Sequence, residues 1–189
     1  HFNWYVKHVR LMPYTTADMK TIANVEFARA RSFLKIEEHR NRSLPAQPLV
    51  KSAAEHEAGV REAEEFIRSF TRREQLLTIP DGLPPFETDT FWAVRPGGRH
   101  HFWEELGYRD PLNNHIHASI PGHEFDGLIQ RQNPRSIRRS FQDGPRTEGW
   151  GFYLEEMYLQ AGLLDQRPRV RELFYIAQLA RAARIPAEL

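Results

Sequence analysis

The chain has 189 residues, of which 40% are hydrophobic and 27% are charged, a balance typical of one soluble globular domain with a substantial core. The net charge of +1 argues against a nucleic-acid-binding protein, and no run of about 18 apolar residues is present to span a membrane. The absence of cysteine excludes disulfides and thiolate metal sites and leaves the compartment, cytoplasmic or exported, undecided.

The first half of the chain predicts two long helices. After an aromatic and basic start, Thr16 is a candidate cap and Asp18 suits the first turn of a helix that ends near residues 41–43. A second helix is predicted from about Ser52 to Leu77, with a Glu/Arg-rich face in solvent. Its apolar stripe comprises Val60, Ala63, Ile67 and Phe70.

The middle of the chain has no helical pattern. The stretch "TIPDGLPP" predicts a turn. The stretch "TDTFWAVRP", residues 88–96, is the one plausible strand, in which Phe91 and Val94 flank Trp92. The following stretch "RPGGRHHFWEELGYRDPLNN", residues 95–114, predicts a loop rich in glycine, proline and aromatic residues.

The last third of the chain predicts further helices. Pro121 suits the first position of a helix over "PGHEFDGLIQRQ", and two more helices are predicted over about 147–163 and 168–184. The expected architecture over residues 1–189 is therefore one mainly α domain, or a fragment of a domain, with at most a small strand element.

Five of the nine histidines lie within a short part of this irregular region: His100, His101, His115, His117 and His123. Histidine is the commonest metal ligand and a frequent acid or base near pH 7. His117 and His123 are six residues apart, which is wrong for one face of a continuous helix. The Pro-Gly break at 121–122 allows both side chains to face one ion, although a loop with solvated histidines fits the spacing as well.

A second candidate stretch is "TEGWGFYLEEMYLQAGL", residues 147–163. On a helix, Glu148, Phe152 and Glu155 share a face, so two carboxylates flank an aromatic ring. Such carboxylates need a cation or a metal as partner when they are buried; otherwise Glu148 caps the helix and Glu155 pairs with an arginine. The expected packing face of this helix comprises Trp150, Tyr153, Met157, Ala161 and Leu164.

These two stretches resemble the paired signatures of the bacterial domain-of-unknown-function 885 family, H-E-x-x-P-G-H-H-x-Q and E-G-W-A-L-Y-x-E. Nine residues match in order: His117, Pro121, Gly122, His123, Glu148, Gly149, Trp150, Tyr153 and Glu155. Weaker similarity extends upstream, over "WYVKHVRLMPYTTADMKTIANVEFAR", and downstream, at "QLARAARI".

The resemblance implies a helical, zincin-like fold and a metal-dependent hydrolase that acts on peptide or small amide substrates. Carried over to this chain, the metal ligands are His117, His123 and Glu148. Zinc is the expected metal, and iron or manganese also suits such ligands. Family members are mostly larger, and the chain begins at His1, so we expect the C-terminal part of a larger protein whose remainder, or another chain, completes the pocket.

The sequence departs from the family pattern where the family has its general base. Ala118 follows His117 in place of glutamate, and Glu124 replaces the family's second histidine. In one interpretation Glu124 or Glu155 takes the base role. In a second, Glu124 joins the metal ligands. In a third, hydrolysis is lost and the fold is a binding or structural module.

Other candidate residues have two interpretations each. Tyr153 either donates to an oxyanion or packs in the core. Arg181 and Arg184 either bind a substrate carboxylate or lie in solvent at a helix end. Arg138 and Arg139 either bind an anion or are ordinary surface residues.

Overall fold

The computed structural model describes residues 1–87 and 91–189. The chain divides into two compact units. The hairpin unit comprises residues 1–44 and 171–189, and the site unit comprises residues 45–170. The described residues form helices and contain no strand, which confirms the mainly α class.

The hairpin unit contains α1 (Phe2–His8), α2 (Thr16–Arg40) and most of α9 (Pro168–Glu188). Two side-chain contacts show that α2 and α9 run antiparallel, because the residue number rises in α2 and falls in α9 from one contact to the next. Phe33 stacks on Tyr175 with ring centroids 5.5 Å apart, and Glu37 lies 3.2 Å from the guanidinium of Arg171.

The amino end of α2 is fixed by a capping box. The Thr15 hydroxyl accepts from the amide of Asp18 at 3.2 Å, and the Asp18 carboxylate accepts from the amide of Thr15 at 2.9 Å. The sequence predicted Thr16 as the cap. The cap is Thr15 because the reciprocal carboxylate must stand three residues after the capping residue, and Asp18 has that spacing from Thr15 alone.

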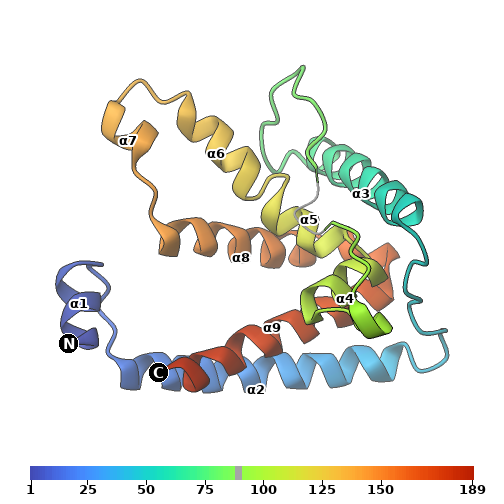
Figure 1. The fold of residues 1–189 in the computed structure, drawn as a ribbon, viewed down its shortest axis with the longest axis horizontal. Coiled ribbons are helices and arrows are strands. Elements are labelled where there is room, and N and C mark those ends of the chain that lie inside the picture. Colours follow the sequence, from blue (N-terminus) through green and yellow to red (C-terminus); the bar gives the residue numbers. More distant parts are fainter. Residues whose placement is uncertain (88–90) are drawn as a thin grey trace. The chain divides into compact units, whose positions relative to one another are not determined.

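The site unit is built from several helices of different length: α3 (Ala53–Arg73), α4 (Phe102–Arg109), α5 (Leu112–Ala118), α6 (His123–Arg131), α7 (Ser136–Ser140) and α8 (Gly144–Gln160), with short 3-10 turns η1 (Pro96–Gly98) and η2 (Leu163–Gln166). Figure 1 shows α5 among its neighbours, and it contacts α3, α4, α6 and α8. Six of the seven residues of α5 are buried. A short helix enclosed in this way is held by tertiary packing and not by its own propensity.

The core of the site unit includes the stripe predicted for α3, whose four apolar residues are all buried. α3 ends at Arg73, earlier than predicted. Gln75 adopts a left-handed conformation with φ 53°, and the amide of Leu76 donates to the carbonyl of Thr71 at 3.1 Å. This is a Schellman arrangement with glutamine in place of the usual glycine, so the sequence contains no glycine to mark the helix end.

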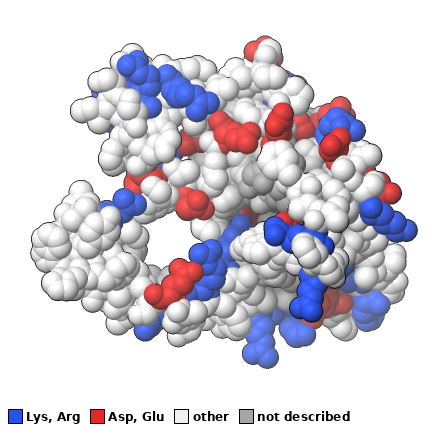
Figure 2. Space-filling view, in the orientation of Figure 1, with Lys and Arg blue, Asp and Glu red and all other residues white. Residues whose placement is uncertain are grey.

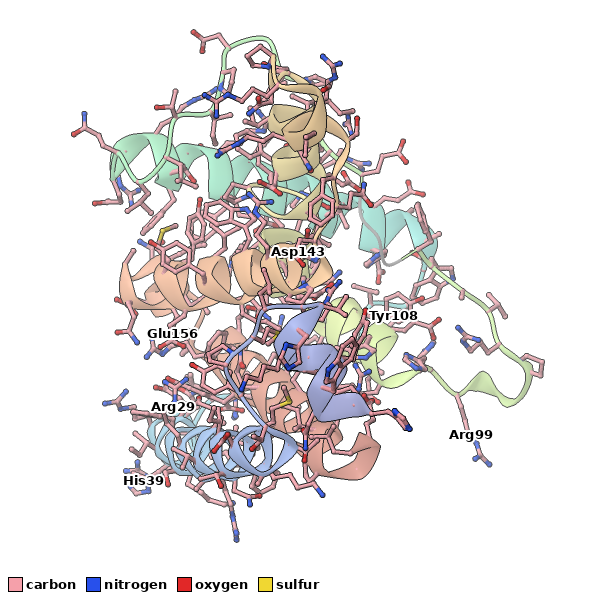
Figure 3. All side chains as sticks on the ribbon, turned by 90° about the vertical axis from the view of Figure 1, so that its left-hand side faces the viewer. Arg29, His39, Arg99, Tyr108, Asp143 and Glu156 are labelled. Atoms are coloured by element: carbon pink, nitrogen blue, oxygen red, sulfur yellow. The ribbon has the colours of Figure 1, made fainter. Side chains whose placement is uncertain are left out.

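Three other sequence expectations need correction. The predicted strand lies partly outside the described residues, and its described part is irregular over 91–95 before Pro96 begins the turn at η1. Figure 3 shows Arg99, directly after this turn, projecting away from the helices. The predicted loop over 95–114 contains α4 and the start of α5. Pro121 lies outside α6, which begins at His123.

The helix over the second signature runs from Gly144 to Gln160, three residues earlier than predicted. Its buried residues are Gly151, Leu154, Glu155, Tyr158 and Leu159. The predicted packing face was therefore wrong in part, since Tyr153 is 58% exposed. Gly162 has φ 90° and ends this helix, as expected from its position.

None of the helices in residues 1–87 and 91–189 combines the length and the apolar character that a bilayer crossing requires.

Candidate metal centre

The two histidines of the first signature come from successive helices that meet at a tight connection. His117 lies in the last turn of α5, and His123 is the first residue of α6. Gly122 permits the connection because a Cβ atom there would collide with the carbonyl group of His117. The two imidazole rings lie 4.6 Å apart, centroid to centroid, at 79°, so the break at 121–122 does bring them side by side.

Glu148, in the first turns of α8, brings a carboxylate to both rings. Its Oε2 lies 3.3 Å from Nε2 of His117, and its Oε1 lies 3.6 Å from Nε2 of His123. The possible ligand atoms of the three residues all lie within 4.8 Å of one another. The His117 side chain is only 10% exposed, whereas that of Glu148 is 59% exposed, so the group is anchored in the core and open on one side.

The inner side of His117 is held by a buried carboxylate. Nδ1 of His117 donates to Oε1 of Glu155 at 2.5 Å, and Nδ2 of Asn113 donates to Oε2 of the same carboxylate at 3.2 Å. The Glu155 side chain is fully buried. A proton held on Nδ1 leaves the lone pair on Nε2 directed toward Glu148, which is the tautomer that a metal ligand requires.

α8 passes unusually close to the ring of His117. A Cβ atom at Gly151 would lie 2.6 Å from Cε1 of the imidazole, so the residue must be glycine for the ring to keep this place. Phe152 packs edge-to-face against the same ring, with ring centroids 5.4 Å apart. The indole of Trp150 donates to the carbonyl of Pro121 at 2.9 Å and thereby ties the connection between the two histidines to α8.

The donor atoms are of the types and near the spacing that a divalent ion requires. Bonds of about 2.0–2.1 Å at tetrahedral angles place ligand atoms about 3.3 Å apart, close to the two histidine–carboxylate separations of 3.3 and 3.6 Å, which end on different oxygens of Glu148. Two imidazoles and one carboxylate suit zinc, and also iron or manganese. The carboxylate on Nδ1 of His117 is the arrangement that orients histidine ligands in metalloproteins.

A second group of buried charged residues joins α3 to α5. Nε2 of His115 lies 2.5 Å from Oε2 of Glu64, and Nε of Arg68 donates to Oε1 at 2.5 Å. Burial alone would raise the pKa of Glu64, but the hydrogen bonds from His115 and Arg68 outweigh it and hold this pKa below its usual value. Sequence reasoning missed Glu64, although its place directly after Ala63 in the apolar stripe signals a buried face.

The remaining predicted site residues lie outside this group. Glu124 is an exposed residue of α6 next to His123. Tyr153 is exposed and stacks on Trp150 at 5.7 Å. Arg181 and Arg184 belong to the hairpin unit, where Nε of Arg184 donates to Glu188 at 2.8 Å. Ala118, which stands where the first signature has glutamate, is buried at the end of α5.

Comparison with known proteins gives one match. The family model described as "Bacterial protein of unknown function (DUF885)" matches residues 15–186. No curated protein and no solved structure matches the chain. The matched range includes both signatures and every residue of the metal-ligand group, so the chain belongs to this family of bacterial proteins of unknown function.

Proposed function

We propose that His117, His123 and Glu148 bind one divalent metal ion, with zinc as the first candidate, and that the chain is a metal-dependent hydrolase of peptide or amide bonds. The observation that carries the proposal is the convergence of three ligand side chains from three helices within 4.8 Å. Chance clusters of exposed acidic groups lack the buried carboxylate that orients His117 here.

The open side of the cluster suits a catalytic site better than a structural one. Structural zinc sites use four protein ligands, whereas catalytic sites use three and keep one position for water or substrate. A divalent ion held here would supply Lewis acidity, which polarises a carbonyl and makes water a nucleophile near neutral pH.

The two carboxylates considered as the base differ in their surroundings. Both oxygens of Glu155 lie within hydrogen-bond distance of buried side chains, so this residue is suited to orienting His117. Glu124 is exposed beside His123, and both residues line one cleft. We therefore assign to Glu124 the removal of a proton from the attacking water, and to Glu155 the positioning of His117.

The metal proposal is tested by metal analysis of the purified protein. We expect about one zinc ion per chain after incubation with zinc and dialysis, and loss of that ion in His117→Ala, His123→Ala and Glu148→Ala. The matched control is His101→Ala, which removes an exposed histidine outside the cluster. A wild-type chain that takes up no zinc, iron or manganese would contradict the proposal.

The hydrolase proposal is tested by turnover of a library of blocked peptides by the zinc-loaded chain. Glu124→Gln should lower turnover about 10²–10⁴-fold, the usual contribution of a positioned base, while the zinc content stays unchanged. Equal turnover of Glu124→Gln and wild type would remove Glu124 from the base role.

The alternative function is a metal-binding module without hydrolytic activity. Ala118 favours it, because the family's base position carries a methyl group here. Stoichiometric zinc together with no cleavage of any peptide in the library would establish this alternative.

A further inference from the structure

Two adjoining clefts open along α6, and one of them reaches the metal centre. The inner cleft, of about 410 Å³, is lined by His123 and Glu124 among others. The outer cleft, of about 440 Å³, lies between α6, α7 and the start of α8. The two adjoin, since they share Asp126, Gln130 and Thr147 as lining residues, and we refer to them together as the path. Each volume lies in the range of small-ligand sites, about 300–1,000 Å³.

The walls of this path are held by side-chain hydrogen bonds. Arg146 of α8 binds Asp126 of α6 through both guanidinium nitrogens, with Nη2 donating to Oδ1 at 2.7 Å. The amide of Gln130 donates to the carbonyls of Arg138 and Phe141, at 3.0 and 2.6 Å. These contacts tie α7 to α6 and form the cleft before any ligand enters, which lowers the entropic cost of binding.

The outer cleft combines exposed apolar surface with positive charge. Ile129, Ile137 and Phe141 are 40%, 79% and 64% exposed. Arg131 lines the inner cleft and Arg138 the outer one. Within the described part of the chain, no carboxylate lies within ion-pair distance of either guanidinium. Figure 2 shows basic side chains gathered over the region that α6 and α7 occupy in Figure 1.

The charges along the path change sign with distance from the cluster. Glu124 and Glu148 lie at the metal end, whereas residues 127–142 contain four arginines and no acidic residue. The acidic residues of the outer cleft lie beside Arg146: Asp126 forms an ion pair with it, and Asp143, seen in Figure 3 at the start of α8, raises its pKa further. Arg131 and Arg138 therefore remain as cations for an incoming ligand.

We propose that this double cleft binds a peptide whose segment beyond the reacting bond carries an apolar side chain followed by a carboxylate. The apolar side chain lies over Ile129, Ile137 and Phe141, and the carboxylate, from an acidic residue or a chain end, binds Arg138 with support from Arg131. This proposal rests on the proposed function in that it names the substrate class of the same metal centre.

The test is a binding measurement that does not need turnover. Three labelled hexapeptides share Ala-Ala-Leu-Phe and end in Glu-Glu, Gln-Gln or Lys-Lys, with blocked termini. Fluorescence anisotropy is measured with the chelator-dialysed chain at about 50 mM salt. We expect the Glu-Glu peptide to bind about fivefold to tenfold more tightly than the Gln-Gln peptide, and this preference to vanish at about 0.5 M salt.

Arginine variants test whether the preference for the Glu-Glu peptide arises in the cleft. Arg138→Gln should weaken binding of the Glu-Glu peptide about threefold to fivefold, and Arg131→Gln with Arg138→Gln about tenfold. The matched control is Arg139→Gln, which removes the same charge from the neighbouring residue of α7 and lines neither cleft. Equal binding of the three peptides, or equal weakening by Arg138→Gln and Arg139→Gln, would overturn the proposal.

This design separates the two proposals. If the chain neither binds metal nor cleaves peptides but prefers the acidic peptide through Arg138, the proposal of a peptide site in the cleft is supported and the hydrolase proposal is refuted. If the chain binds metal stoichiometrically and cleaves peptides but shows no preference among the three, the hydrolase proposal is supported and the proposed acidic substrate class is refuted.

Discussion

At the residue scale, the candidate metal centre depends on how His117 is enclosed. Glu155 holds one nitrogen of its ring, Glu148 approaches the other, and Gly151 leaves the space in which the ring lies. The signature alone predicts Glu148 as a ligand and Glu155 as a neighbour on the same face. It does not reveal that the second glycine of "EGWG" is required by contact with a ring from another helix.

We therefore predict that Gly151→Ala weakens zinc binding by at least about tenfold, because the new methyl group displaces the imidazole, and supporting contacts of metal ligands contribute about 10–100-fold to affinity. Competition with a fluorescent zinc chelator measures the change. Gly149→Ala is the matched control on the same helix, since a Cβ atom there meets no atom within 4 Å. Equal affinities for the two variants would show that the close approach does not position His117.

At the element scale, the long helices follow from local sequence and the short ones do not. α2 and α3 are long enough for their caps, apolar stripes and charged faces to be recognised in the sequence. α4 and α5 have too few residues for a period to be recognised, and α5 is helical because neighbours surround it on all sides. Asp110 ends α4, and its side chain accepts from the amide of Leu112, the first residue of α5, at 2.9 Å.

The capping box of α2 gives a prediction at this scale. Thr15→Ala should lower the free energy of unfolding by about 1 kcal/mol, because it leaves the amide of Asp18 without its side-chain acceptor. Thr16→Ala, one residue later, should change it by less than about 0.5 kcal/mol. Chemical denaturation of both variants measures the difference, and a larger loss for Thr16→Ala would place the cap where the sequence predicted it.

At the scale of the whole molecule, the site unit has a polar contact deep in its core that links distant parts of the chain. The hydroxyl of Thr71 in α3 donates to the carbonyl of Ile67 at 2.6 Å, so the hydroxyl of Tyr158 in α8 donates to Thr71 across 2.5 Å. Both residues are fully buried. Burial raises the pKa of Tyr158 to about 12.

This contact predicts a stability difference that depends on pH. At pH 7, Tyr158→Phe should lower the free energy of unfolding by about 1 kcal/mol through loss of the hydrogen bond. Since the folded-state pKa of about 12 exceeds the ordinary tyrosine value of 10.0, the stability contributed by neutral Tyr158 is complete below pH 10 and is lost as the pH rises toward 12. The difference in unfolding free energy between wild type and variant should therefore fall by up to about 2 kcal/mol over this range, so that it passes through zero and the variant becomes the more stable protein near pH 12.

Urea denaturation at several pH values from 8 to 12 measures this gap. Tyr153→Phe is the control, because Tyr153 is an exposed tyrosine on the same helix; its small effect should be the same at every pH. A gap for Tyr158→Phe that stays constant up to pH 12 would contradict the prediction.

The helical class, the two long helices of the first half and the two stretches that carry the candidate ligands were predictable from the sequence, because caps, periodicity and paired motifs are local properties. Which residues meet depended on the tertiary structure. Glu64 pairs with His115 across 51 residues, Glu155 reaches His117 across 38, and the clefts beside His123 arise where α6, α7 and α8 come together. Such contacts depend on how helices pack, and packing is set by the shapes of many side chains at once and not by any single spacing.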